Sequence, residues 1–190
     1  MSDVRVLVLP GSFRQGAYSH ALARAAVARL ATLGASGEIL DLRALALPIY
    51  DGDFEAGQGV PAGAKTLVEA FAAHDAVLVA SPEYNAFPTP LFMNAIDWAT
   101  RLPEHKAAMG GKPTALLSSS PGMLGGLRAL LALRNFLAIN PGMLVIPQQF
   151  ALPQAAKAFA ADGSLADAKQ QEALDGVLAA LVTLARAVRG

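Results

Sequence analysis

Short apolar runs alternate with longer segments of helical periodicity along most of this chain. Five of these runs predict buried strands, at residues 4–9, 37–42, 76–80, 114–117 and 143–146. Apolar residues that recur every three or four positions predict the helices, at residues 17–33, 62–73, 88–101, 124–137 and 167–188. A strand that returns in the same direction needs such a crossover helix, so the pattern indicates parallel strands.

Right-handed crossovers place helices on both faces of a parallel sheet, which predicts an α/β, doubly wound five-stranded sheet. Of the two common strand orders, the flavodoxin-like order 2-1-3-4-5 fits five strands. That order gathers the loops after strands one, three and four around one ligand. With 190 residues, 54% of them hydrophobic, and no linker or repeat, we expect a single domain over residues 1–190.

The composition limits the kinds of partner that this chain is expected to bind. Lys plus Arg and Asp plus Glu number 15 each, so no excess of charge favours nucleic acid or an anionic membrane, and a small-molecule partner is expected. No apolar tract reaches the roughly 18 residues of a membrane helix, and the first apolar run is too short for a secretory signal. We therefore expect a cytoplasmic protein. The absence of cysteine excludes thiolate chemistry and leaves redox chemistry to a cofactor.

The segment after the first strand has the chemistry of a phosphate site. Gly11 permits a tight exit from the strand, Ser12 and Ser19 offer hydroxyl donors, and Arg14 offers a cation. The following helix adds free backbone N–H groups and the positive end of its dipole. The spacing matches neither the Rossmann nor the nucleoside triphosphatase fingerprint, which favours a mononucleotide. The alternative is a plain strand-to-helix turn with its cap.

Two further loops point to the same ligand. In the loop after the third strand, prolines stiffen a backbone whose N–H groups can face a planar heterocycle, beside Tyr84 and Asn85. The alternative there is that Tyr84 packs in the core and Asn85 completes a turn. The glycines at 118–126, after the fourth strand, let backbone approach a ligand closely. All three loops lie where the predicted fold binds ligands, and this convergence favours function.

The three histidines, His20, His74 and His105, have spacings that suit neither a metal site nor a nucleophile triad. We expect them to be surface or capping residues. Glu83 lacks a partner carboxylate and is expected to bind rather than to catalyse. Trp98 is expected to pack on a helix face.

These segments resemble the NADPH-dependent FMN reductase family, which includes quinone, chromate and azo-dye reductases. The resemblance rests on Gly-Ser-x-Arg at 11–14, Pro-Glu-Tyr-Asn at 82–85, Asn-Ala-Ile-Asp-Trp at 94–98 and Gly-Lys-Pro at 111–113, and spans residues 4–146 in matching order. It implies FMN as cofactor, with the phosphate held by Ser12, Arg14, Gln15, Gly16, Ala17, Tyr18 and Ser19. It further implies that Pro82, Glu83, Tyr84 and Asn85 line the isoalloxazine ring and ribityl chain, and that Ser119 and Gly122 close the other side.

The activity implied by the resemblance is a ping-pong reaction. NADPH or NADH gives a hydride to the flavin, and a quinone or similar small molecule then takes the electrons. The cofactor carries the chemistry, so no catalytic side chain is assigned. The resemblance also implies a homodimer or homotetramer, in which Tyr50 and Asp51 reach toward a neighbouring subunit's flavin.

One departure from the family pattern concerns the phosphate loop. The family's loop runs Gly-Ser-x-Arg-x-Gly-Ser-x-Asn, whereas this chain has Ala17 and Ser19 at the last two marked positions. We expect weaker FMN retention, with Ser19 partly replacing the asparagine. Two other functions stay open: a flavodoxin-type electron carrier, against which the even charge balance argues, and a non-flavin α/β module on the same scaffold.

Overall fold

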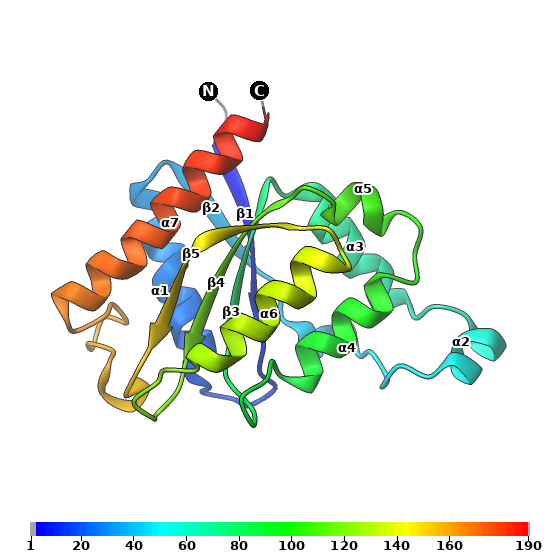
Figure 1. Cartoon of the computed structure of the whole chain (residues 1–190), viewed down its shortest axis with the longest axis horizontal. Helices are drawn as coiled ribbons and strands as arrows, with labels where there is room; N and C mark the ends of the chain where they lie inside the picture. The colour runs from blue at the N-terminus through cyan, green and yellow to red at the C-terminus, as the bar shows by residue number, and fades with distance from the viewer. Residues whose placement is uncertain (1–2, 190) are drawn as a thin grey trace.

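In a computed structural model, which describes residues 3–189, the predicted strands form one parallel sheet in the order β2-β1-β3-β4-β5 (Figure 1). The strands are β1 (Val4–Pro10), β2 (Ala35–Ile39), β3 (Ala76–Ser81), β4 (Pro113–Ser119) and β5 (Leu144–Leu152). The strand order and the parallel pairing confirm the predicted flavodoxin-like class.

Helices cover both faces of the sheet (Figure 1). One face is covered by α1 (Tyr18–Thr32) and α7 (Ala168–Arg189). The other face is covered by α3 (Ala62–Ala73), α4 (Pro90–Ala99), α5 (His105–Met109) and α6 (Leu127–Ile139). The short α2 (Gly52–Gln58) projects from the edge of the molecule (Figure 1).

The two hydrophobic layers come from alternate residues of the same strands. Along β1, Val6 and Val8 belong to the layer under α1 and α7, whereas Leu7 and Leu9 belong to the layer under α3, α4 and α6. Successive side chains of a strand point to opposite faces, so a strand covered on both faces reads as an unbroken apolar run. This is why β1 and the fully buried β3 could be predicted from sequence.

The predicted second strand is displaced. The sequence pattern predicts residues 37–42, but β2 is Ala35–Ile39, and Leu42–Leu45 forms a 3₁₀ turn capped by the Asp41 side chain. An edge strand pairs with only one neighbour, here β1, and its residues are largely exposed, so it has no continuous apolar run. Leu42 is buried, but within the turn rather than in the strand.

The fifth strand is longer than the predicted 143–146. A bulge interrupts its pairing, because Thr114 pairs with Val145 but Leu116 with Gln149. The Arg134 guanidinium donates to carbonyl oxygens inside the bulge, at 2.6 Å to that of Ile146. The strand therefore continues past a proline and two glutamines that conceal it in the sequence.

The helices differ from prediction mainly at α6, which begins at Leu127 rather than at residue 124. Gly125 and Gly126 have φ of 61° and 88°, a left-handed conformation that cannot belong to an α-helix. The helices α2 and α5 were not predicted, since with seven and five residues they are too short to show helical periodicity. Within residues 3–189, none of the helices combines the length and the apolarity needed to cross a membrane.

Candidate functional site

The candidate site lies where the strand order reverses. After β1 the chain passes to β2 on one side and then to β3 on the other, so the loops after β1 and β3 separate above the sheet. A cavity of about 310 Å³ lies at this point. Its wall comes from the loops after β1, β3 and β4: Ser12, Arg14, Ala17, Tyr18, Ser19, Pro82, Glu83, Tyr84, Ser119, Ser120 and Pro121.

The structure therefore brings most of the predicted site residues into one wall. The predicted residues outside it are Gln15, Gly16, Asn85 and Gly122. Sequence reasoning missed Ser120 and Pro121, which directly follow β4. Both residues could have been predicted, because they belong to the loop after the fourth strand, and that whole loop was expected to lie at the ligand.

The loop after β1 is tied to the sheet and to α4 at its start. The Gly11 amide donates to the Ala80 carbonyl at 2.9 Å, and the Thr89 hydroxyl donates to the Gly11 carbonyl at 2.7 Å. A side chain on Gly11 would place its Cβ 3.0 Å from the Ser81 Oγ, so any larger residue would require Ser81 to shift. The loop thus begins from a fixed point.

The loop ends at the N-terminus of α1, which has no side-chain cap because Ala17 is the N-cap residue. The amides of Tyr18 and Ser19 belong to the first turn and have no intrahelical acceptor. Free amides and the positive end of the helix dipole favour an anion here. Both residues line the cavity, so the cavity has an anion-binding end.

Two serine hydroxyls in the cavity wall are buried without a partner. Among residues 3–189, Ser19 Oγ and Ser119 Oγ are the buried side-chain polar atoms that form no hydrogen bond. Leaving a buried hydroxyl unsatisfied costs about 1–3 kcal/mol. Because both hydroxyls line the cavity, ligand oxygens bound there would supply the missing partners.

Charge in the wall is arranged for a negative ligand. The Arg14 guanidinium lies 5.4 Å from the centre of the Tyr18 ring and is exposed. The Glu83 carboxylate is bound elsewhere, to the Arg128 guanidinium and to the Ala129 amide at the start of α6. Arg14 is therefore the cationic side chain in the cavity wall, and the one acidic side chain there, Glu83, is already paired.

The pKa of Glu83 reflects this pairing. Burial raises the pKa of the Glu83 carboxyl, but the hydrogen bonds from Arg128 and Ala129, with the guanidinium charge, outweigh burial and leave the pKa below its ordinary value. The carboxylate is thus ionised at neutral pH and poorly suited to proton transfer. This placement agrees with its expected lack of a catalytic role.

The loop after β3 is a tight turn over Tyr84–Phe87. Each of these two residues donates its amide to the other's carbonyl at 3.0 Å, and the central Asn85 and Ala86 have φ of 52° and 68°. Two successive left-handed residues make a type I′ turn, which asparagine tolerates well. Asn85 therefore completes a turn, as one alternative held. Tyr84 is 48% exposed, so it does not pack in the core as the other alternative held.

The histidines are more engaged than expected. His20 lies 2.8 Å from the Ser12 carbonyl oxygen through its Nε2. His74 is only 5% exposed and is the C-cap of α3, so it is a capping residue, which is the second of the two expected roles. His105 contacts the Leu102 carbonyl and is the first residue of α5. Within residues 3–189 no group of histidines and carboxylates is arranged to hold a metal ion.

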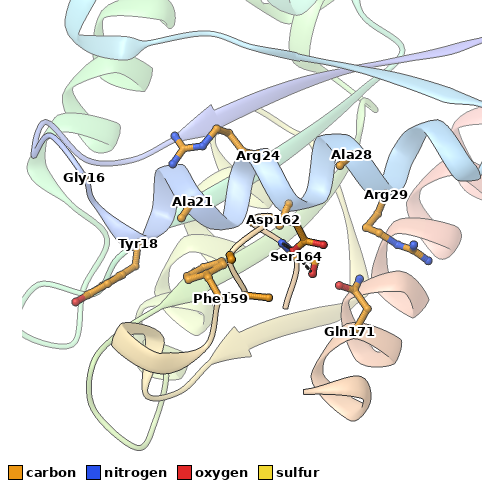
Figure 2. Close-up of a pocket in the computed structure, with 14 residues that line it drawn as sticks. Gly16, Tyr18, Ala21, Arg24, Ala28, Arg29, Phe159, Asp162, Ser164 and Gln171 are labelled. Atoms are coloured by element: carbon orange, nitrogen blue, oxygen red, sulfur yellow. Dashed lines mark hydrogen bonds between the residues drawn. The ribbon is translucent and has the colours of Figure 1, made fainter. Parts of the chain in front are cut away.

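A second cavity, of about 650 Å³, adjoins the first and shares Tyr18 with it (Figure 2). It lies between α1 and the segment 159–164, with α7 at one end, and Phe159 forms part of its wall. Its Arg29 guanidinium is already bound to Asp175 at 2.7 and 2.8 Å. Neither orphaned hydroxyl lines this cavity, so the smaller cavity is the stronger candidate.

Two side chains of the Asn-Ala-Ile-Asp-Trp segment, residues 94–98, bind the stretch of backbone that leads into α2. The Asn94 side chain accepts from the Tyr50 amide and donates to the Pro48 carbonyl, both at 2.8 Å, and the Trp98 indole donates to the same carbonyl at 2.7 Å. Tyr50 packs edge-on against Trp98 at 5.0 Å between ring centres. Trp98 is buried, as expected, but its hydrogen bond was not foreseen. We call residues 46–61 the arm.

Fold and site together define a flavodoxin-like protein with an anion-binding end to its switch-point cavity. Residues 4–157 match the family model of the NADPH-dependent FMN reductases. An NAD(P)H-dependent FMN reductase of Pseudomonas aeruginosa is 37% identical over 191 residues, covering 99% of this chain and 98% of its own. A quinone reductase of Escherichia coli K12 is 35% identical over 148 residues, which cover 77% of this chain and 76% of the length of that reductase.

A solved structure extends the likeness to three dimensions. The flavoenzyme NAD(P)H:(acceptor) oxidoreductase FerB of Paracoccus denitrificans superposes with a TM-score of 0.82 at 32% identity, over 97% of this chain and 98% of that one. This chain belongs to the NADPH-dependent FMN reductase family. Membership confirms the family resemblance, the oxidoreductase class and the cofactors expected from the sequence.

Proposed function

We propose that this chain is an FMN-dependent NAD(P)H oxidoreductase that passes electrons from the nicotinamide through the flavin to quinones or related small acceptors. It acts as a single FMN-binding domain in the cytoplasm. The observation that carries the proposal is the pair of orphaned hydroxyls, Ser19 and Ser119, in a switch-point cavity with an uncapped helix N-terminus.

The proposed placement of FMN gives the cavity a phosphate end and a ring side. At the phosphate end lie Ser12, Arg14 and the Ser19 hydroxyl, with the free amides of the first turn of α1. Along the ring lie Pro82, the backbone of Glu83 and the Tyr84 side chain, and Ser119 closes the other side. Ala17 and Tyr18 also line the wall. Gln15, Gly16, Asn85 and Gly122 lie outside it, and in this proposal they act through their backbone in the same loops.

Bound FMN supplies the hydride chemistry, and the chain supplies position and charge. Tyr84 stands half-exposed at the cavity wall, where a planar nicotinamide or quinone stacked on the ring would meet it. Because Glu83 is ionised and paired, the wall offers no free carboxyl group for proton transfer. The nicotinamide and the quinone would use the same open face of the flavin ring in turn. This favours the ping-pong order.

The arm supports assembly as a homodimer or homotetramer. It projects beyond the sheet, yet it is held firmly by Asn94 and Trp98 (Figure 1). Ile49, beside Tyr50 and Asp51, is 87% exposed. A rigid projection with an exposed apolar side chain suits insertion beside a neighbouring subunit's flavin.

An anaerobic absorbance titration tests the proposal. Flavin-free protein is titrated with FMN, then mixed with NADPH, then with a quinone. Saturable binding, bleaching of the flavin band by NADPH and recovery on adding the quinone are expected. Binding without bleaching identifies an electron carrier, and no binding identifies a non-flavin module; either result overturns the proposal.

A further inference from the structure

His20 is bonded to the phosphate loop from within the helix that follows it. Its Nε2 lies 2.8 Å from the Ser12 carbonyl oxygen, which can only accept, so Nε2 carries the proton. Ser12 is 4% exposed, and among residues 3–189 no second group donates to its carbonyl. A buried carbonyl that loses its partner is costly, so this bond fixes the local backbone.

Few other contacts hold the loop beyond Ser12. The Arg14 amide donates to Ser12 Oγ at 3.2 Å, and the Ala17 amide donates to the Arg14 carbonyl at 3.1 Å. Residues 13–16 are all exposed, and their side chains contribute two cation–π contacts, Arg43 with the Phe13 ring and Arg14 with the Tyr18 ring, each at 5.4 Å. The shape of this segment therefore depends on a small number of hydrogen bonds, and His20 supplies one of them.

The bond from His20 sets the direction of a peptide group. In a planar trans peptide the C=O and the following N–H point in opposite directions. Because the Ser12 carbonyl points at His20, the Phe13 amide points away from the His20 side chain. The amides of Phe13, Gln15 and Gly16 form no hydrogen bond within residues 3–189. These residues do not line the cavity themselves, but they adjoin Ser12, Arg14 and Ala17, which do, so their amides are available to an anion at this edge.

We propose that His20 is a positioning residue for the cofactor's phosphate: its imidazole holds the Ser12–Phe13 peptide, and with it the loop amides, in the orientation that a phosphate requires. The inference rests on the proposed function, since the phosphate is that of FMN. The family's loop has a serine and an asparagine where this chain has Ala17 and Ser19. In this inference His20 takes over part of their role in holding the phosphate.

The test compares FMN with riboflavin, which has the same ring but no phosphate. His20→Leu removes the donor at similar volume, His20→Gln keeps an N–H at similar reach, and His105→Leu is the matched control. Like His20, His105 contacts a backbone carbonyl, that of Leu102, but it lies outside the cavity wall. We expect His20→Leu to weaken FMN binding about tenfold, the effect of one lost hydrogen bond. Riboflavin binding should be unchanged, and His20→Gln should restore most of the FMN affinity.

A second measurement needs no flavin. Hydrogen–deuterium exchange of residues 12–17 in flavin-free protein should be faster in His20→Leu and normal in His20→Gln and His105→Leu. Equal exchange in all variants, or equal losses of FMN and riboflavin affinity, overturns the inference while leaving the proposed function intact. Wild-type protein that binds neither flavin overturns the proposed function, and the assignment of a phosphate-positioning role with it.

Discussion

The Glu83 carboxylate and the Arg128 guanidinium join the loop after β3 to the start of α6, with Glu83 Oε1 2.9 Å from Arg128 Nε. The second carboxylate oxygen accepts the Ala129 amide at 3.2 Å, so the charge lies at the helix N-terminus, where the dipole favours an anion. Gly126 makes the approach possible, because a Cβ there would lie 2.9 Å from that of Ser118 and 3.5 Å from that of Glu83. One ion pair thereby ties the loop after β3, which lines the cavity, to the start of α6.

Replacing Glu83 by glutamine should reduce stability in a pH-dependent way. The folded pKa of Glu83 lies below its ordinary 4.5, so the carboxylate stabilises the fold above that value and loses this effect as pH falls through the folded pKa. We expect Glu83→Gln to lower the free energy of unfolding by about 1–3 kcal/mol at pH 7. The difference from wild type should shrink steadily below about pH 4.

Urea unfolding of both proteins at pH 7 and at pH 3.5 measures this effect. The exposed Glu172→Gln, on α7, serves as the control and should match wild type at both values. A deficit of the same size at both pH values would mean that shape rather than charge makes residue 83 important.

The orphaned hydroxyls predict opposite effects on stability and on ligand binding. Ser19→Ala and Ser119→Ala remove a buried hydroxyl that has no partner, so flavin-free protein should keep its stability or gain up to about 1 kcal/mol. FMN binding should nevertheless weaken about fivefold to tenfold for each, because the ligand loses a donor.

Ser118→Ala provides the contrast. Its hydroxyl donates to the Gly125 carbonyl at 2.8 Å, so this variant should lose about 1–2 kcal/mol of stability even without flavin. Thermal unfolding with and without FMN separates the two kinds of serine. If Ser19→Ala and Ser119→Ala destabilise the flavin-free protein as Ser118→Ala does, the two hydroxyls are bonded within the protein and do not await a ligand.

Restoring the family's serine at position 17 should strengthen both the fold and the site. Ala17 is the N-cap of α1 and offers no side-chain acceptor. A serine hydroxyl there would cap the first turn, worth about 0.5–2 kcal/mol, and would lie in the cavity wall as a further phosphate donor. We expect Ala17→Ser to raise the melting temperature and to tighten FMN binding several-fold.

The control for position 17 is Ala31→Ser, an exposed site near the end of the same helix, which should give neither gain. Calorimetry and flavin fluorescence quenching measure the two effects. Higher stability with weaker FMN binding would contradict the prediction, since the new hydroxyl would then be competing with the phosphate for the same amides.

The arm should loosen when its anchors are removed. Asn94→Ala deletes the bonds to Pro48 and Tyr50, and Trp98→Phe deletes the indole bond to Pro48. Each should cost about 1–3 kcal/mol and expose residues 46–61 to protease. Their effects should not add, because Asn94 and Trp98 share the Pro48 carbonyl.

Limited proteolysis followed by mass spectrometry locates the new cleavages. Asn135→Ala, an exposed asparagine on α6, should leave the digestion pattern unchanged. Cleavage spread over the sheet and helices, with none concentrated in the arm, would show that Asn94 and Trp98 stabilise the whole fold rather than this segment.

Sequence predicted the central part of the fold better than its edges. The central strands β1, β3 and β4 are buried on both faces apart from Arg5 and therefore contain runs of apolar residues, 6–9 in β1, 76–80 in β3 and 115–117 in β4. The edge strands β2 and β5 have exposed residues and, in β5, a bulge at Pro147, so hydrophobic pattern alone misplaced one and shortened the other. Their positions are set by pairing with β1 and β4, which is tertiary information.

The site was predictable as a meeting of loops but not as a set of contacts. Strand order placed Ser12, Tyr84 and Ser119 together, because parallel strands end at one edge of the sheet. The partner of Glu83 lies 45 residues away on α6, and that of His20 is a carbonyl in the loop. No short-range pattern encodes such pairs, since they arise only when helices dock.

Thr89 links the ends of two of these loops through one hydroxyl, which donates to Gly11 and accepts the Phe92 amide at 3.3 Å. The residue is 1% exposed, so water does not compete for either bond. The walls that would receive a cofactor are therefore assembled before it arrives, and little rearrangement accompanies capture. Association of flavin with the empty protein should accordingly follow simple second-order kinetics, with a rate that rises in direct proportion to flavin concentration and shows no plateau from a slow opening step.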